Sequence, residues 1–171
     1  MGRVLGVDPG MHETGWAILD GASSCARLVA SGVIRTMPGT PLPQRLKSIH
    51  AELGAVIASH RPDSCAMEEM FFTTIATTVR ATLQARGVAL LAIAQAGHPV
   101  HEYNPKTVKL TLTGSGRAEK AQMQTVVQKA LGLLEKLKPN DVADAAAIAL
   151  CHLRTGRMKG MRVLDSWGHS R

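Results

Sequence analysis

The stretch Arg3-Val4-Leu5-Gly6-Val7-Asp8-Pro9-Gly10 decides the fold that we expect. Its apolar run predicts a buried first strand, and the Pro-Gly pair is typical of a turn that ends the strand. The strand therefore finishes on one carboxylate, Asp8. A charge at the tip of a buried strand is costly unless a cation lies beside it. Taken alone, Asp8 is also explained as a turn cap or a solvated loop residue, so a functional role depends on carboxylates from elsewhere.

The composition indicates one globular domain with a polyanionic partner. Of 171 residues 45% are apolar, and no apolar run approaches the length of a membrane helix. Lys and Arg outnumber Asp and Glu by 20 to 13, which favours binding to nucleic acid because basic side chains release the counterions of phosphates. A basic protein that is merely soluble is the alternative. The three cysteines have no metal-ligand spacing and we see no secretory signal, so we expect reduced thiols in the cytoplasm.

Hydrophobic periodicity predicts an α/β fold. After the first strand we expect strands over 14–19, 28–34, 64–70 and 100–103, and helices over 44–59, 73–95, 104–114, 118–134 and 141–154. Short connections suggest that the first three strands form an antiparallel meander. The strand after the first helix should lie beside the first strand, parallel to it. We expect a domain over residues 1–155 and a basic, mobile tail over 156–171.

Two later stretches supply further carboxylates. Asp141 and Asp144 lie three residues apart at the start of the last helix, so they share a face, although acids in a first turn also favour the helix dipole without any function. Alanines surround Asp144, which fits a capping role less well. Glu68 and Glu69 end the fourth strand and point to opposite faces, and spacing alone does not choose between them. Together with Asp8 these oxygen ligands suit Mg²⁺ or Mn²⁺ rather than Zn²⁺, and two such ions can promote phosphodiester cleavage.

The order of these motifs carries a family resemblance. The motifs are Gly6-Val7-Asp8-Pro9-Gly10 with Thr14-Gly15, Ala66-Met67-Glu68, Gln84-Ala85-Arg86-Gly87, Lys109, Ala118-Glu119-Lys120 and Asp141-Val142-Ala143-Asp144-Ala145. In this order they resemble the RuvC family of crossover (Holliday) junction endodeoxyribonucleases, over about residues 3 to 153. The resemblance implies a ribonuclease-H-like fold, a mixed five-stranded sheet flanked by helices. It also implies an enzyme that resolves four-way DNA junctions by symmetric, metal-dependent hydrolysis in recombination and repair.

The resemblance also implies roles for individual residues. The metal ligands, for two Mg²⁺ or Mn²⁺ ions per active site, would be Asp8, Glu68, Asp141 and Asp144, with Glu68 chosen over Glu69. Lys109 and Lys120 match family lysines implicated in cleavage, where an ammonium can stabilise charge that develops in the transition state. An aromatic at the position of Phe71 stacks on or wedges into unpaired bases in the family. The DNA-binding candidates are Phe71, Phe72, Arg80, Arg86, Lys106 and Arg117.

Partners follow from the same resemblance, and other functions compete with it. The implied assembly is a homodimer with the long helix in its interface, working with the branch-migration proteins RuvA and RuvB. Another ribonuclease-H-like nuclease, which cuts RNA–DNA hybrids, is disfavoured by the paired lysines and the Phe. An actin-like ATPase would need a second lobe, for which 171 residues leave no room. A junction-binding module without activity is disfavoured by carboxylates at all the metal positions.

Overall fold

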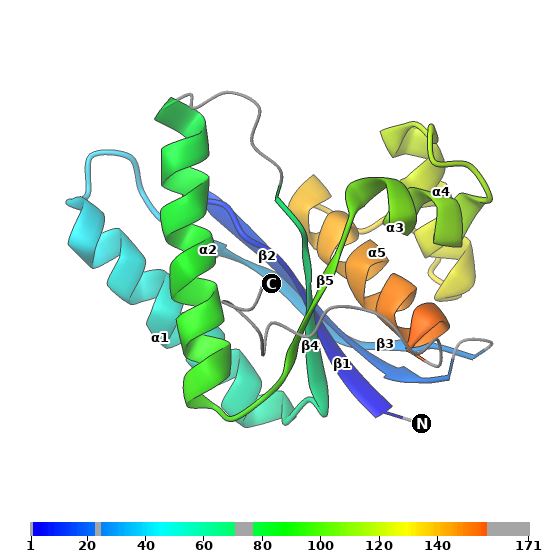
Figure 1. Ribbon diagram of the computed structural model, residues 1–171, viewed down its shortest axis with the longest axis horizontal. Coiled ribbons are helices and arrows are strands. Elements are labelled where there is room, and N and C mark those ends of the chain that lie inside the picture. The colour runs from blue at the N-terminus through cyan, green and yellow to red at the C-terminus, as the bar shows by residue number, and fades with distance from the viewer. Residues whose placement is uncertain (1, 23–24, 71–76, 157–171) are drawn as a thin grey trace, which may run out of the picture.

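The computed structural model describes residues 2–22, 25–70 and 77–156 (Figure 1). Five strands form one sheet in the order β3-β2-β1-β4-β5. Their bounds are Gly2–Asp8 (β1), Glu13–Gly21 (β2), Arg27–Arg35 (β3), Ser64–Glu68 (β4) and Val100–Tyr103 (β5). The pairs β1–β2 and β2–β3 are antiparallel, whereas β4 is parallel to both β1 and β5. The expected meander and the parallel crossover beside the first strand are therefore confirmed.

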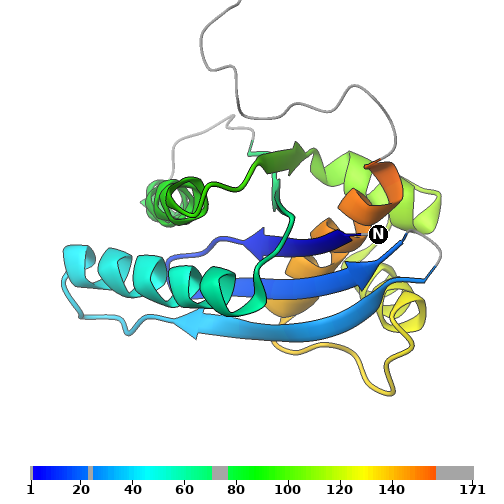
Figure 2. The same ribbon diagram turned by 90° about the horizontal axis from the view of Figure 1, so that it is seen from below.

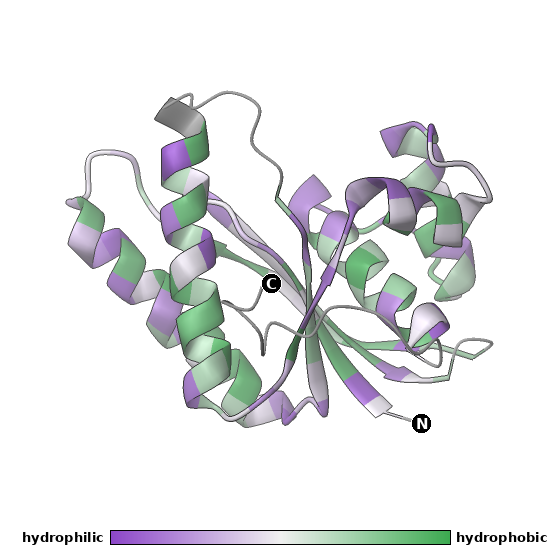
Figure 3. Cartoon of the chain, in the orientation of Figure 1, coloured by the Kyte–Doolittle hydropathy of each residue, from purple (hydrophilic) through white to green (hydrophobic). Residues whose placement is uncertain are grey.

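Helices cover both faces of this sheet, as the turned view in Figure 2 shows. One face carries α1 (Leu42–His60) and α2 (Thr77–Gln95), and the other carries α3 (Pro105–Thr113), α4 (Lys120–Ala130) and α5 (Asn140–Thr155). Strand alternation supplies both cores: Val4 packs with the α5 side and Leu5 with the α1–α2 side. Figure 3 shows that the helices carry both apolar and hydrophilic residues, and that apolar residues run along much of the strands. The expected mixed sheet flanked by helices is thus confirmed.

Glycines in β1 and β2 let α5 pack directly against the sheet. A Cβ atom on Gly6 would come within 2.1 Å of the Ala145 carbonyl oxygen. A Cβ on Gly15 would come within 2.1 Å of the Asp141 carbonyl oxygen. Both positions therefore need glycine for this close approach. The contact brings the start of α5 against β1 and β2 near the end of β1 that carries Asp8.

Some expected element bounds differ from the structure. Helix α4 ends at Ala130 rather than at 134, because Gly132 takes a left-handed conformation with φ of 63°. Strand β4 ends at Glu68 rather than at 70. The expected helix start over 73–76 and the expected tail over 157–171 lie outside the described residues. Within the described part, no helix is long and apolar enough to cross a membrane.

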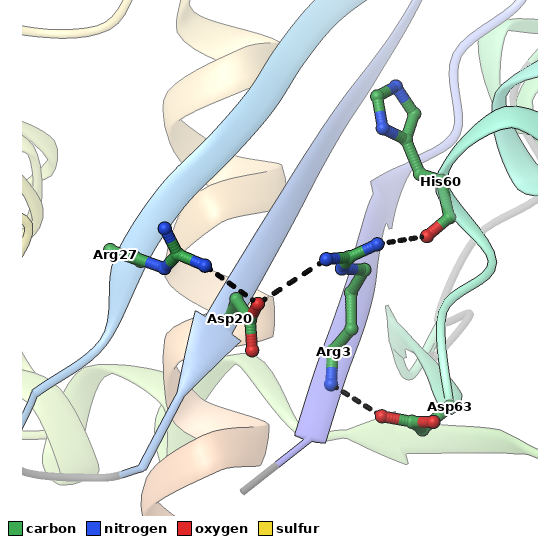
Figure 4. A network of polar contacts seen from close by, with 5 residues as sticks. All are labelled: Arg3, Asp20, Arg27, His60 and Asp63. Atoms are coloured by element: carbon green, nitrogen blue, oxygen red, sulfur yellow. Dashed lines mark hydrogen bonds and ion pairs between the residues drawn. The ribbon is translucent and has the colours of Figure 1, made fainter.

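A polar network fixes the opposite end of β1, as Figure 4 shows. The Arg3 guanidinium donates 2.7 Å to the His60 carbonyl and pairs with Asp20 at 3.4 Å, and Asp20 also pairs with Arg27 at 3.2 Å. The Arg3 backbone N–H donates to the Asp63 carboxylate at 2.7 Å. These contacts join β1 to β2, β3 and the turn before β4.

Candidate active site

Two neighbouring parallel strands deliver the first carboxylates. Asp8 is the last residue of β1 and Glu68 the last of β4, and the register that pairs Val7 with Met67 brings these ends to the same edge of the sheet. The pKa of Asp8 is raised from 3.8 to about 7, mainly by burial and in part by the nearby charges of Asp144, Asp141 and Glu68. The other three carboxylates therefore lie close enough to Asp8 to repel its charge.

Helix α5 contributes Asp144 together with a basic partner from α4. The Lys120 Nζ atom donates a hydrogen bond of 2.8 Å to Asp144 Oδ2. This hydrogen bond is the main reason why the pKa of Lys120 is raised. Asp144, Lys120, Glu68 and Lys109 share the lining of an open cavity of about 290 Å³. Two ammonium groups and two carboxylates thus face one solvent-accessible space, with an apolar wall that includes Ile148.

The structure distinguishes Glu68 from Glu69. Burial raises the pKa of Glu68, the charge of Asp144 raises it further, and Lys109 is the leading charge that lowers it. The Glu69 backbone N–H continues toward β5 and donates 2.8 Å to the Tyr103 carbonyl. Of the two acids it is Glu68 that lines the cavity, so the geometry favours the choice that the resemblance makes.

Asp141 lies in the first turn of α5 beside an acid that the sequence analysis missed. Burial raises the pKa of Asp141, its backbone hydrogen bond opposes this, and the carboxyl of Glu13 raises it further through a hydrogen bond. Glu13 also pairs with Arg35, its cross-strand partner, at 2.9 Å. The expected strand begins at residue 14 and excludes Glu13; because β2 starts at Glu13, alternation places this acid on the same face as Gly15, which contacts α5.

The DNA-binding candidates are placed very differently from one another. Arg80 on α2, Lys106 on α3 and Arg117 before α4 are exposed, as phosphate contacts require. Phe71 and Phe72 lie outside the described residues.

Arg86 does not fit the expected phosphate contact. Its exposure is only 7%, and its Nη1 donates 2.7 Å to the Glu68 carbonyl while its Nη2 pairs with the Glu102 carboxylate. The physical reason is that Arg86 lies on the face of α2 that points into the protein, where its guanidinium binds protein groups instead of solvent. The sequence signals for Glu102 were weak, since a single acid in a short strand is usually solvated.

The donor chemistry of the site fits Mg²⁺ or Mn²⁺. The carboxylates of Asp8, Glu68, Asp141 and Asp144 offer oxygen ligands, which these hard cations prefer. Within residues 2–22, 25–70 and 77–156, the side chains as placed form no group of three or more acids, thiols or imidazoles that could hold a metal ion. Burial, and secondarily repulsion by the neighbouring acids, raises the pKa of Asp8, and a divalent cation would stabilise its charged form. The donor set therefore fits such a cation chemically.

Acids lie at the ends of β1 and β4 of a mixed sheet and at the start of a helix that packs on β1. This arrangement defines a class of protein. The fold and the site are those of a ribonuclease-H-like nuclease. Residues 4–152 match the model of the family described as crossover junction endodeoxyribonuclease RuvC. The chain belongs to this RuvC family.

Individual relatives agree with this assignment. The crossover junction endodeoxyribonuclease RuvC of Chloroflexus aurantiacus is 48% identical over 153 residues, which span 90% of this chain and 93% of the relative. That of Pelotomaculum thermopropionicum is 48% identical over 149 residues, 87% and 91% of the two chains. Among solved structures, Thermus thermophilus RuvC in complex with a Holliday junction substrate superimposes with a TM-score of 0.90 at 35% identity, covering 95% of this chain and 99% of that one. The expected family and fold class are confirmed.

Proposed function

We propose that this chain resolves four-way DNA junctions by symmetric, metal-dependent phosphodiester hydrolysis in recombination and repair. The observation that carries the proposal is the coupling of Asp8 to three other carboxylates at one edge of the sheet, with Lys120 bonded to one of them. Such a charge cluster is costly to build. Its presence in a chain of a family of junction endonucleases supports a catalytic site rather than a binding module.

The carboxylates and lysines have separate roles in this proposal. Asp8, Glu68, Asp141 and Asp144 would hold Mg²⁺ or Mn²⁺, two per active site. Bound cations of this kind supply an activated water and stabilise the leaving oxygen. Lys120 holds Asp144 in place and, with Lys109, presents positive charge to the cavity where a scissile phosphate would develop negative charge.

Exposed basic groups are the proposed DNA contacts, and the proposed oligomeric state follows from the family. The formal charge of +7 favours binding to DNA phosphates, with Arg80, Lys106 and Arg117 as the described candidates. Phe71 and Phe72 are proposed to contact junction bases. We infer a cytoplasmic homodimer through α2, since two equivalent sites cut a pseudo-symmetric junction symmetrically. RuvA and RuvB are the proposed partners, residues 1–155 the nuclease domain and 156–171 its tail.

The test compares four labelled substrates with Mg²⁺ or Mn²⁺: a mobile four-way junction, a linear duplex, a flap and an RNA–DNA hybrid. We expect paired nicks in the junction alone, and loss of both nicks with junction binding retained in Glu68→Gln. Preferential cleavage of the hybrid would assign the chain to another activity of the fold. Tight junction binding without nicks under either metal would leave a binding module and contradict the proposal.

A further inference from the structure

Arg86 is a buried cation outside the cavity of the candidate active site. The side chain is 8% exposed, and its partner Glu102 is 16% exposed. Removing a charge from water costs several kcal/mol unless partners compensate it. Here the partners are the Glu102 carboxylate and the carbonyl oxygen of Glu68, the latter at 2.7 Å. Two nitrogens of the guanidinium thus contact the end of β4 and β5.

The contact with Glu68 falls at the point where β4 ends. The register pairs Met67 with Glu102 and Glu68 with Tyr103, so Glu102 lies on the neighbouring strand one position back from the catalytic acid. From α2, Arg86 therefore spans the last residue of β4 and the adjacent side chain of β5. Because the Glu68 carbonyl belongs to the residue whose carboxylate faces the cavity, holding this peptide restricts the direction in which that carboxylate projects.

Arginine suits this geometry better than lysine. Its planar guanidinium donates several hydrogen bonds in a fixed fork, so it can bond the Glu68 carbonyl and the Glu102 carboxylate together. A lysine ammonium is a compact charge on a flexible stem and holds two partners less rigidly. If only the charge matters, Arg86→Lys should behave as wild type; if positioning matters, Arg86→Lys should still be impaired.

We propose that Arg86 is a positioning residue that fixes the catalytic Glu68 through its carbonyl, with Glu102 as the anchor of the guanidinium. This inference rests on the proposed role of Glu68 as a metal ligand. Groups that orient metal ligands typically contribute factors of 10 to 100 in metal affinity or activity. Arg86 is set apart from the phosphate contacts because it acts from inside the protein.

The experiment uses the full chain with Arg86→Gln, Arg86→Lys, Glu102→Gln and the Arg86→Gln/Glu102→Gln double variant. The control is Arg27→Gln, which removes the same charge from a side chain 74% exposed at the other end of the sheet. Junction affinity is measured in EDTA, and single-turnover cleavage is measured over a range of Mg²⁺ concentrations. For Arg86→Gln we expect cleavage about 100-fold slower, a half-saturating Mg²⁺ concentration about tenfold higher and a junction Kd within about twofold of wild type. Arg86→Lys should recover part of the loss.

The pair and the folding state are tested by the other variants. If Glu102 anchors Arg86, Glu102→Gln has a smaller defect of the same kind, and the double variant is about as slow as Arg86→Gln. Independent, multiplying defects would overturn the anchoring role. Thermal unfolding establishes the folded fraction, and if Arg86→Gln does not fold, Arg86→Lys and Glu102→Gln decide by the same Mg²⁺ shift.

Other outcomes separate this inference from the proposed function. Weakened junction binding with an unchanged Mg²⁺ requirement would make Arg86 a DNA contact and overturn the inference. A lower Tm with normal cleavage per folded molecule would reduce Arg86 to a structural role. If Glu68→Gln still cleaves, the proposed function of the site fails. If Glu68→Gln is inactive while Arg86→Gln matches Arg27→Gln, only the positioning role fails.

Discussion

Replacing Asp8 by asparagine should stabilise the protein in the absence of divalent cations while it abolishes cleavage. Asp8 is half-buried at the end of β1, near Asp144, Asp141 and Glu68, and its pKa is raised from 3.8 to about 7. Burial is the main cause and repulsion by these acids adds to it. Asparagine has nearly the same shape but no charge. It therefore resembles the protonated carboxyl that the folded protein favours.

The size of the effect follows from the two pKa values, with the sign set by proton binding. Between pH 3.8 and about 7 the folded protein keeps the Asp8 proton while the unfolded chain releases it. Stability contributed by this group is therefore complete below pH 3.8 and is lost as the pH rises to about 7. The interval corresponds to a maximum of about 4 kcal/mol. With relaxation of the site, we expect Asp8→Asn to be more stable than wild type by about 1–4 kcal/mol at pH 8 and by little at pH 4.

The assay is urea unfolding in EDTA at several pH values from 4 to 8, with Glu52→Gln on the exposed side of α1 as the matched control. That control removes an acid without touching the site, so its difference from wild type should stay within about 0.5 kcal/mol. Excess Mg²⁺ should then stabilise wild type more than Asp8→Asn, since a ligand stabilises the state that binds it. A stability difference that does not change with pH, or an Asp8→Asn protein less stable than wild type at pH 8, would refute the electrostatic argument.

Three further perturbations test other parts of the structure. Gly15→Ala places a Cβ 2.1 Å from the Asp141 carbonyl oxygen, so it should lower the free energy of unfolding in urea by about 1–3 kcal/mol and slow cleavage. The control Gly54→Ala, whose Cβ meets nothing within 4 Å, should be neutral or stabilising. Equal effects of the two substitutions would contradict the packing of α5 on β2. Lys120→Met removes the ammonium from Asp144 and should slow single-turnover junction cleavage about 100-fold while binding is retained; an unchanged rate would remove Lys120 from the chemistry. Burial, and secondarily His101, lowers the pKa of His152 from 6.5 to about 4, so the folded protein resists protonation there and wild type should lose up to about 3 kcal/mol as the pH falls through that window. In His152→Gln this loss between pH 6.5 and 4 should be absent from urea unfolding curves, and a retained slope would show that another group titrates.

The fold was largely predictable because its strands carry strong local patterns. Short connections between the first three strands predicted the meander of β1 to β3, and the single helix before β4 implied a parallel crossover. That crossover predicted that Asp8 lies near the Glu68-Glu69 pair, whereas the choice of Glu68 came from the family resemblance. The end of α4 did not, because apolar residues continue beyond the left-handed Gly132 that stops the helix.

The supporting residues of the site could not be predicted, for a physical reason. An arginine on a helix is normally solvated, and only the packing of α2 shows that Arg86 points inward to Glu68. Glu13 lies just before the strand expected over 14–19, and its partner Asp141 comes from a helix far along the chain. Pairings of this kind depend on tertiary contact rather than on local pattern.

The same carboxylate cluster should respond with opposite signs to two groups of substitutions. Neutralising an acid such as Asp8 removes repulsion and should raise stability while it removes function. Substitutions of Arg86, which bonds the Glu68 carbonyl, or of Gly15, which packs against the Asp141 carbonyl, should lower both stability and cleavage. A cluster of solvated surface acids would show neither response, because water would already screen the charges. The opposite signs therefore identify the end of β1 as a site where the fold maintains unfavourable charge for its chemistry.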